Sequence, residues 1–401
     1  MTLPNNDGPL SGLRVIDLTR ILAGPFCTMN LGDMGAEIIK IERQGSGDDT
    51  RRWGPPFVEG EAAYFLGINR NKSSVTLDLR SPKGQEILKE LLKNADIVIE
   101  NFKVGTLDRW GITDDWRDKN APQLIHCSIT GYGERGPKGG MPGYDFLLQA
   151  ESGLMSITGD INGGPTKLGV AIVDVCTGLY SAMTILAAIN ARNNTGRGQR
   201  IKTSLFDTGL SLLVNVASNY LVGSKEGSRF GNGHPNIVPY SDFNCKSGEI
   251  AIAVGNDAQF YKFSECVGHP EWENDIRFNT NPERVKNRET LEDLITEALS
   301  QDSAEAWIKK LSSLSVPCSM VMSVSQALDS DQAKANNMVV EINHPLAGII
   351  KMLGIPFRFS DTPESIKSPP PTLGENTDEI LLKYANVSKS EIDQLRNDNI
   401  I

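Results

Sequence analysis

Apolar runs and helical patterns alternate along the first hundred residues, and this alternation restricts the fold more than any other feature of the chain. A buried strand is predicted at 13–19, a short helix at 25–35 and a second strand at 36–42. Strands that alternate with helices form a parallel sheet, which places the chain in the α/β class. Further strands are predicted at 73–79, 96–102, 123–133 and 200–207, and further helices at 81–95 and 175–194.

The character of the sequence changes at about residue 222, which predicts a domain boundary. Segment 241–255 has the pattern of a hairpin, and charged helices such as 283–300 follow it. From about residue 335 a strand-and-turn pattern returns, and a proline-rich stretch then precedes a final helix. We therefore divide the chain into 1–221, 222–330 and 331–401.

Composition narrows the location and the partners of the protein. Of its 401 residues 39% are hydrophobic and 22% are charged, and no apolar run reaches the roughly 18 residues of a membrane span. A net charge of −10 argues against nucleic acid or an anionic membrane as the main partner. Residues 1–12 lack a basic start and an apolar core, so we expect a cytoplasmic protein, or one of the mitochondrial matrix. Six scattered cysteines without a CxxC pair predict reduced thiols and no structural metal.

The turn after the first predicted strand, 20–25, is a candidate binding loop. It contains a single glycine, whereas dinucleotide-binding turns read GxGxxG, so the acid Glu42 at the end of the next strand is weak evidence for NAD. Arg43 offers instead a bidentate fork for a phosphate. Other basic side chains lie nearby in sequence, and the alternative is that all of them are solvated surface charges. They are Arg51, Arg52, Arg70, Lys72 and Arg80. Of these, Arg51, Arg52 and Arg70 make a dicarboxylate substrate plausible.

Asp174 is a carboxylate between an apolar, strand-like run at 167–173 and the helix predicted at 175–194. That helix is apolar nearly all round, which predicts burial on every side. The simplest role for Asp174 is an N-cap, which accepts backbone N–H bonds from the first turn. The alternative is a nucleophile that attacks an acyl carbon. A helix N-terminus lowers the pKa of a carboxylate and keeps it ionised, so the two roles are compatible.

Three other polar residues have both a structural and a chemical interpretation. Asp145 precedes a helix, where it could cap a turn or exchange a proton with a substrate. His126 lies in a strand pattern, which favours a core histidine over a catalytic base. His234 lies in the loop 231–235, whose two glycines allow the backbone to approach a ligand closely. The sequence contains neither a serine nucleophile elbow nor a P-loop.

These residues lie in segments that resemble the family III CoA-transferases, a group that includes carnitine CoA-transferases, formyl-CoA:oxalate transferase and the α-methylacyl-CoA racemases. The matching segments cover nearly the whole chain and include LSGLRVIDLTRILAGPFCTMNLGDMGAEIIKIERQGSGDDTR, VIENFKVGTLDRWGI, GVAIVDVCTGLYSAMTILAAI and PPPTLGENTDEIL. Long matches in order are more specific than any single motif. Within the family, GDDTRRWGPPFV and HPNIVPY resemble the dicarboxylate-using succinate–hydroxymethylglutarate (glutarate) CoA-transferases most closely.

The resemblance implies roles for individual residues. The family's nucleophilic aspartate falls on Asp174, because the D-x-x-x-G pattern of the family is met by Asp174 and Gly178. This favours the nucleophile over the cap. The candidate substrate or lid residues are Tyr144, Asp145, Gly231, Gly233 and His234, and the backbone N–H groups of the two glycines are candidate oxyanion donors. The CoA contacts carry over to Arg20, Ile21, Ala23, Arg43, Leu77, Arg80, Asn101, Phe102 and Arg109.

The resemblance also implies an activity and an assembly. CoA would pass from an acyl-CoA such as succinyl-CoA to a free acid such as glutarate or hydroxymethylglutarate, through an aspartyl anhydride and an aspartyl-CoA thioester. No cofactor is expected beyond CoA as substrate, and no metal. The implied fold is a large Rossmann-like domain with a parallel sheet built from both chain ends, a smaller α+β domain and an interlocked homodimer.

Two other functions stay open. One is an acyl-CoA racemase or epimerase, although its two-base arrangement is incomplete here, because Tyr144 rather than histidine precedes Asp145. The other is a non-catalytic CoA-binding protein.

Overall fold

The computed structural model describes residues 8–401, and residues 1–7, on which part of the expectation about a leader depends, lie outside the described residues. The chain forms two compact units. The first comprises the described residues up to Gly153, Leu168–Leu213 and Gln332–Ile401, and the second comprises Leu154–Lys167 and Val214–Asp331. The second unit thus includes a segment, Leu154–Lys167, that the sequence-based division assigned to the first domain.

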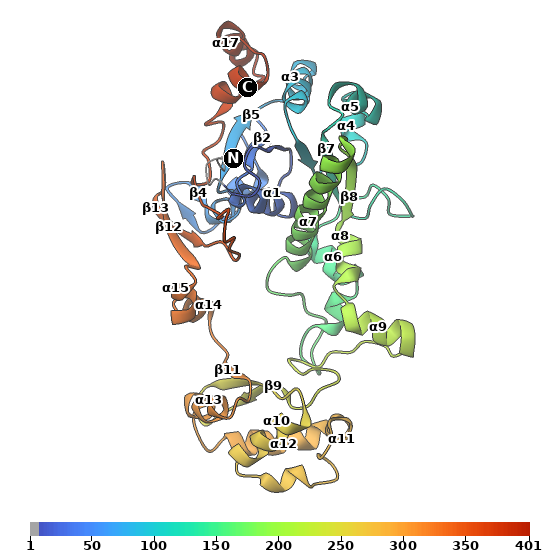
Figure 1. Cartoon of the computed structure of the whole chain (residues 1–401), viewed down its shortest axis with the longest axis vertical. Helices are drawn as coiled ribbons and strands as arrows, with labels where there is room; N and C mark the ends of the chain where they lie inside the picture. The colour runs from blue at the N-terminus through green and yellow to red at the C-terminus, as the bar shows by residue number, and fades with distance from the viewer. Residues whose placement is uncertain (1–7) are drawn as a thin grey trace. The chain divides into compact units, whose positions relative to one another are not determined.

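A six-stranded parallel sheet is the centre of the first unit (Figure 1). Its order, β5-β2-β1-β6-β7-β8, is that of a Rossmann fold, because these are the third, second, first, fourth, fifth and sixth of its strands along the chain. The connection reverses between β1 and β6, and ligands of such folds bind at the carboxyl ends of the strands there. The strands are β1 (Arg14–Asp17), β2 (Glu37–Glu42), β5 (Lys72–Thr76), β6 (Ile97–Glu100), β7 (Ile125–Thr130) and β8 (Arg200–Ser204).

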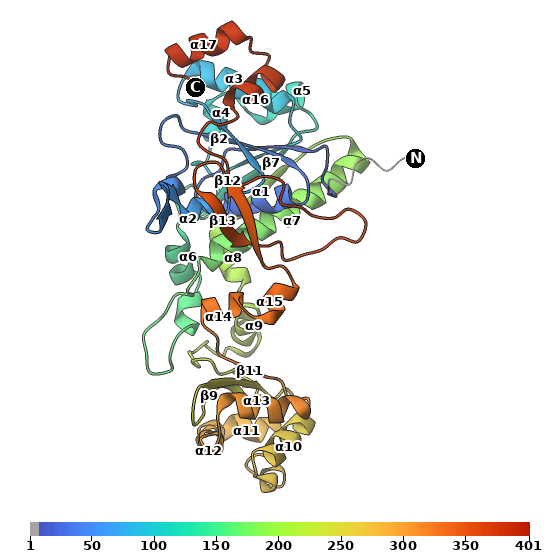
Figure 2. The ribbon, with the colours of Figure 1, turned by 90° about the vertical axis from the view of Figure 1, so that its left-hand side faces the viewer.

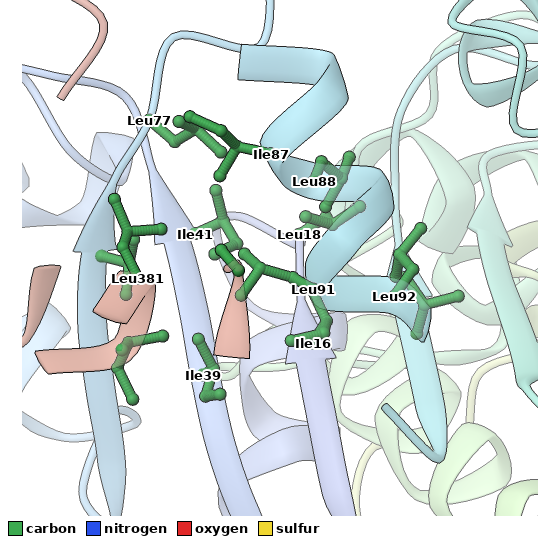
Figure 3. Packing of buried hydrophobic residues seen from close by; sticks show 14 of the residues in the cluster. Ile16, Leu18, Ile39, Ile41, Leu77, Ile87, Leu88, Leu91, Leu92 and Leu381 are labelled. Carbon is green, nitrogen blue, oxygen red and sulfur yellow. The ribbon is translucent and has the colours of Figure 1, made fainter. Parts of the chain in front are cut away.

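Helix α3 (Pro82–Lys93) covers one face of this sheet and begins as the sequence predicts. The Ser81 hydroxyl accepts a backbone N–H of the first turn, and Pro82 occupies a first-turn position. Leu88 and Leu91 of α3 pack with Ile16 and other aliphatic side chains of the sheet in one buried cluster (Figure 3). Each such side chain contributes roughly 1.5–3 kcal/mol when it is fully buried, so this cluster holds the sheet and its helices together.

The C-terminal segment completes the same cluster with helices. Leu381 of α16 (Thr377–Tyr384) and Ile392 of α17 (Lys389–Asn397) are buried in it, and α16 lies beside α3 (Figure 2). The prediction that both chain ends build the parallel sheet is therefore wrong, because all six strands precede residue 205. The strands near the C-terminus, β12 (Val339–His344) and β13 (Gly348–Leu353), form an antiparallel hairpin of their own.

Helix α7 (Ile172–Thr195) packs on α1 (Ala23–Asp33) and on β7 and β8. It is long and apolar enough to cross a membrane, yet a stripe of mostly small residues buries one of its faces in this unit. The prediction of burial on every side is wrong, because Leu179, Tyr180 and Met183 are exposed. The other elements of this unit are β3 (Phe57–Val58), β4 (Glu61–Ala62), α2 (Ala63–Leu66), α4 (Thr106–Arg109), α5 (Asp114–Asn120), α6 (Asp145–Glu151) and α8 (Leu205–Ser211).

The second unit is an α+β structure with its own core. Its antiparallel sheet has the order β11-β10-β9, and β9 and β10 form the hairpin that the sequence predicts at 241–255. The helix predicted at 283–300 is interrupted at Asn287 and is two helices. The elements are α9 (Val214–Gly223), β9 (Tyr240–Asn244), β10 (Glu249–Ala253), α10 (Asp257–Cys266), α11 (Asn281–Lys286), α12 (Arg288–Leu299), α13 (Ala304–Ser313), β11 (Cys318–Met320) and α14 (Val324–Leu328), and α15 (Asp331–Ala335) follows at the boundary.

Candidate active site

A cavity of about 400 Å³ opens at the carboxyl ends of β1 and β6, where the Rossmann topology predicts a ligand. Asn101, just after β6, joins the two strand ends: its side-chain amide donates to the Arg20 carbonyl at 2.8 Å, and its oxygen accepts the Arg20 N–H at 3.1 Å. Five of the predicted CoA residues line this cavity, together with Asp174. They are Arg20, Ile21, Ala23, Asn101 and Phe102.

A second cavity of about 260 Å³ adjoins the first, because Arg20 and Phe102 line both. Three further predicted CoA residues, Arg43, Leu77 and Arg80, line this one. The ninth, Arg109, lies instead on the exposed turn α4, where its guanidinium donates to the Thr106 hydroxyl. Eight of the nine predicted residues therefore line these two adjoining cavities, and Arg109 lines neither.

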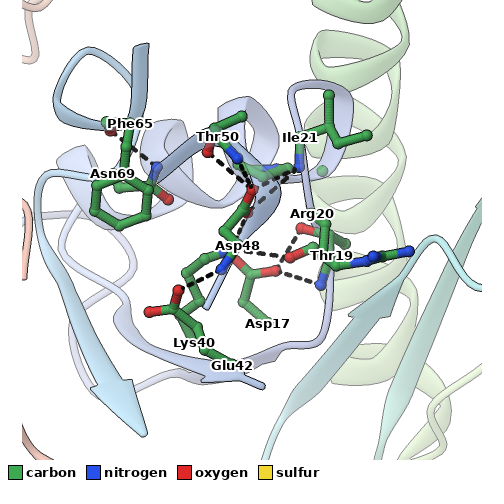
Figure 4. Close-up of polar contacts among 12 residues, drawn as sticks. Asp17, Thr19, Arg20, Ile21, Lys40, Glu42, Asp48, Thr50, Phe65 and Asn69 are labelled. Atoms are coloured by element: carbon green, nitrogen blue, oxygen red, sulfur yellow. Dashed lines mark hydrogen bonds and ion pairs between the residues drawn. The ribbon is translucent and has the colours of Figure 1, made fainter. Parts of the chain in front are cut away.

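Ile21, in the loop after β1, has an unusual backbone with a φ of 72°. A β-branched residue at positive φ is a steric outlier, so the surrounding structure must hold it there. The Asp48 carboxylate does this, because its two oxygens accept the Ile21 N–H at 3.2 and 3.3 Å (Figure 4). Nothing in the sequence pattern indicated Asp48, which is distant from the loop along the chain.

A buried ion pair anchors Asp48 in turn. The Lys40 ammonium lies 2.9 Å from the Asp48 carboxylate and donates to the Thr19 carbonyl at 2.8 Å, and both charged side chains are fully buried. Burial raises the pKa of Asp48, but the charge of Lys40 and hydrogen bonds from Lys40 and Thr50 outweigh it and lower the pKa to about 2. The Lys40–Asp48 ion pair thus stabilises the backbone of the binding loop.

Most of the basic residues that were predicted to form an anion site are engaged in structural ion pairs. Three of them are buried against carboxylates, which corrects the expectation that Arg51 and Arg70 could hold a dicarboxylate. Glu42 belongs to one of these pairs, so it is not free to bind a ribose. Arg52 remains exposed, 3.8 Å from Asp49. The buried pairs are Arg51–Glu42, Arg70–Asp33 and Lys72–Asp17.

Asp174 lies inside α7 rather than at its cap. The helix begins at Ile172, Ala171 is the N-cap residue, and no strand precedes it at 167–171. The prediction that Asp174 caps the helix is therefore wrong. The cap comes from another helix: Asp145 Oδ1, at the start of α6, accepts the N–H groups of Val173 at 2.8 Å and Asp174 at 3.2 Å.

The environment of Asp174 makes it an unusually basic carboxylate. Burial, and then the negative charge of Asp145, raise its pKa from an ordinary 3.8 to about 7. The position at a helix N-terminus led us to expect a lowered pKa, whereas burial and a like charge raise the pKa of Asp174. A carboxylate that titrates near neutrality can act as a nucleophile or as a proton carrier.

Gly178, the second residue of the D-x-x-x-G pattern, allows α7 to approach the binding loop. A Cβ at this position would lie 2.6 Å from the Ala23 carbonyl oxygen, so a larger residue would push α7 away from α1. Gly131 and Gly143 make a similar close approach after β7, because a Cβ on Gly131 would lie 2.4 Å from the Gly143 nitrogen. The pattern of glycines thus brings Asp174 and the loop before α6 to the same cavity.

Tyr144 lines the cavity with an exposed side chain, in the place where a substrate residue was expected. Tyr64, on α2, was not among the expected site residues. Burial, and then the negative charges of Asp174, Asp145 and Asp48, raise the pKa of the Tyr64 phenol. Lys103 adds a second cation beside Arg20 in the lining.

The remaining lid candidates belong to the second unit, and their backbone groups are engaged within it. The N–H of Gly231 donates to the Gly159 carbonyl at 3.2 Å, and that of Gly233 donates to the Phe230 carbonyl at 2.8 Å. The expectation that these N–H groups are free to bind an oxyanion is therefore wrong for this structure. His234 packs its ring against Tyr240, and its Nδ1 accepts the Asn236 N–H at 3.1 Å.

His126 is a core histidine, as predicted, because it is buried in β7 with its Nε2 3.2 Å from the Ser128 hydroxyl. All six cysteines are free thiols. Among residues 8–401, no group of three or more His, Cys, Asp or Glu side chains is placed to hold a metal ion.

Known proteins resemble this chain over nearly its whole length. The sequence model described as CoA-transferase family III matches residues 10–377. The chain is 41% identical to the succinyl-CoA:glutarate CoA-transferase of Mus musculus, over 98% of this chain and 90% of that protein. It is 38% identical to the succinate–glutarate CoA-transferase of Agrobacterium fabrum, over 97% and 98%. A crystal structure of a CAIB/BAIF family protein from Brucella suis superposes with a TM-score of 0.83 at 42% identity, covering 94% of this chain and all of that one.

The chain belongs to CoA-transferase family III. It is therefore an enzyme that uses CoA thioesters as substrates.

Proposed function

We propose that this enzyme transfers CoA from succinyl-CoA to glutarate or a closely related dicarboxylate, with Asp174 as its nucleophile. The observation that carries the proposal is that Asp174 shares one cavity with the loop after β1 and with Asn101. The names of the relatives from Mus musculus and Agrobacterium fabrum supply the substrate pair. Lys103 also lines this cavity and is suited to the second carboxylate of such a substrate, whereas the Arg20 guanidinium is paired with Asp49 at 2.9 Å.

The chemistry follows from the difficulty of exchanging CoA between two carboxylates. In its ionised form, Asp174 attacks the thioester carbonyl of succinyl-CoA and expels the CoA thiolate, which leaves a succinyl–aspartyl anhydride. The thiolate then attacks the aspartyl carbonyl and releases succinate, so that Asp174 carries CoA as a thioester. Glutarate attacks this thioester, and the CoA thiolate recovers the glutaryl group from the second anhydride. Asp174 is thereby regenerated, and each bond that breaks is replaced by another.

Two properties of the site favour this relay. The partial burial of Asp174 limits the access of water to intermediates that hydrolyse readily. Its raised pKa makes the ionised carboxylate more basic, and hence more nucleophilic, than an ordinary aspartate. Its reactivity should therefore depend on pH in the neutral range.

We predict that kcat/KM for succinyl-CoA rises with pH and levels off above about pH 7. Asp174 must lose its proton before it can attack, so below its pKa of about 7 the rate should fall about tenfold per pH unit. Initial rates of glutaryl-CoA formation between about pH 5.5 and 8.5 measure the profile. A profile that is flat down to pH 5.5 would contradict the raised pKa.

The exposed apolar side chains of α7 support a proposal about assembly. Leu179, Tyr180 and Met183 leave one face of this helix open, and Met183 is 56% exposed. We propose that a second copy of the chain covers this face in a homodimer. Light scattering should then give about twice the 43.7 kDa of one chain, and a mass of one chain would refute the dimer.

The function is tested by incubating the enzyme with succinyl-CoA and a panel of carboxylic acids. Mass spectrometry should detect glutaryl-CoA as the preferred product, with formation from monocarboxylates much slower. Deuterium entering the α-carbon of an acyl-CoA without a second acid would point instead to a racemase. Binding of CoA without transfer to any acid would point to a non-catalytic protein.

A further inference from the structure

We infer that Asp145 is a positioning residue, whose carboxylate caps helix α7 from outside the helix and so leaves the side chain of Asp174 free to face the cavity. The inference rests on the proposed function, because it takes Asp174 as the reacting group. It replaces the expectation that Asp145 itself exchanges a proton with a substrate.

The hydrogen bonds of Asp145 show how its carboxylate is used. Oδ1 accepts the N–H groups of Val173 and Asp174 at 2.8 and 3.2 Å. Oδ2 accepts the side-chain amide of Gln149, one turn along α6, at 2.6 Å. Gln149 is 1% exposed, and its oxygen accepts the Leu168 N–H at 2.9 Å. Both carboxylate oxygens therefore hold the segment that leads into α7.

A helix needs such a cap because its first N–H groups have no partner inside the helix. In α7 the N-cap residue is Ala171, whose methyl group cannot accept a hydrogen bond. An acid in the first turn, where Asp174 stands, commonly folds back to satisfy these groups itself. Because Asp145 takes over that task, Asp174 can line the cavity instead. Asp145 thus has the structural role of an acid at the start of a helix, and Asp174 keeps the chemical role.

Asp145 also affects the ionisation of Asp174. Burial is the larger cause of the raised pKa of Asp174, and the charge of Asp145 adds to it. Among the other charged or titratable groups, Arg20 and Lys103 line the same cavity as Asp174, and the charge of Asp174 acts on the Tyr64 phenol of α2. Removing the charge of Asp145 while keeping a hydrogen-bond acceptor should therefore separate the two effects.

Two substitutions at Asp145 test the inference. Asp145→Ala removes the cap, and a displaced nucleophile should lower kcat about 100-fold with less than about a threefold change in KM for succinyl-CoA. Asp145→Asn keeps an acceptor for the two N–H groups but not the charge. It should lower kcat less than about tenfold and shift the rising part of the pH profile of kcat/KM to lower pH by about one unit. Asp115→Asn, an exposed first-turn acid on α5, is the matched control and should change neither.

Two kinetic results would overturn the inference. One is an Asp145→Ala enzyme with normal kcat. The other is an Asp145→Asn enzyme whose kcat falls as far as that of Asp145→Ala while the pH profile of its kcat/KM stays that of the wild type. A measurement that needs no turnover separates this failure from failure of the proposed function. The carboxyl carbon of Asp174 is titrated by carbon-13 NMR, and its signal is assigned by its disappearance in Asp174→Asn. A midpoint that falls in Asp145→Asn supports the inference even if no transfer is found, and an unchanged midpoint in an active enzyme refutes it.

Discussion

Asp174→Asn is expected to abolish CoA transfer while the protein still binds CoA. Asparagine has nearly the shape of aspartate but cannot form the anhydride, so kcat should fall by at least about 10⁴-fold, as it does when other enzymes lose their nucleophile. The cavity residues that we assign to CoA lie in other elements and are unaltered. Kinetics with succinyl-CoA and glutarate measure the loss, and calorimetric titration with CoA measures the retained binding. An Asn variant with near-normal turnover would exclude the nucleophile.

The same substitution should stabilise the protein above pH 5. The pKa of Asp174 is raised from 3.8 to about 7 in the folded state, so ionisation favours the unfolded chain as pH rises. Relative to the Asn variant, the free energy of unfolding of the wild type falls by about 1.4 kcal/mol per pH unit between about pH 4 and 7. The total loss is about 4 kcal/mol at most and does not grow above pH 7. Urea unfolding of both proteins at pH 5 and pH 8 measures this difference. A variant that is less stable than the wild type at pH 8 would contradict the burial of an unpaired carboxylate.

Lys40→Met is the second substitution with a large expected effect. It leaves Asp48 as a buried carboxylate without its cation, and breaking a buried pair in this way typically costs 3–5 kcal/mol, so we expect a loss of about that size. The Ile21 N–H is held by the same carboxylate, so the KM for succinyl-CoA should rise as well. Urea unfolding and steady-state kinetics measure the two effects.

Two further variants make the test of this pair specific. Lys40→Met combined with Asp48→Asn removes both charges and keeps an acceptor for Ile21, so it should recover much of the lost stability. Lys83→Met, which removes an exposed lysine on α3, should cost less than about 1 kcal/mol. Equal losses in Lys40→Met and Lys83→Met would contradict a structural role for the buried pair. Because the pKa of Asp48 is lowered to about 2, the stability that its ionised form supplies is present above about pH 4 and is lost as pH falls towards 2.

Local patterns predicted the class of the fold well, because a parallel sheet imposes them on each strand. β1 and β2 are buried over most of their length, and β-branched apolar residues recur in both. Ser81 and Pro82 identify the start of α3 for an equally local reason. The burial of α7 was overestimated because an apolar helix face looks the same in sequence whether its own chain or another molecule covers it.

The arrangement of the charges could not be predicted from local patterns. Arg51 and Arg70 stand near Arg52 in sequence and suggested one basic site, but Arg70 is bonded to Asp33, 37 residues away. Asp145 likewise caps a helix that begins 27 residues later. Such pairings depend on which strand ends meet in the fold, and the type of a single residue does not indicate its partner. The role proposed for Asp174 came from the family resemblance, through a D-x-x-x-G pattern whose glycine, Gly178, lies in close contact with α1.

The central claim is that Asp174 carries CoA during transfer, and trapping of the intermediate tests it most directly. The enzyme is incubated with succinyl-CoA and quenched with hydroxylamine, which converts an aspartyl-CoA thioester to a hydroxamate and releases CoA. Peptide mass spectrometry should place the hydroxamate on Asp174, only when succinyl-CoA is present and not in Asp174→Asn. A hydroxamate on another residue, or unmodified Asp174 in an enzyme that is making glutaryl-CoA, would contradict the claim.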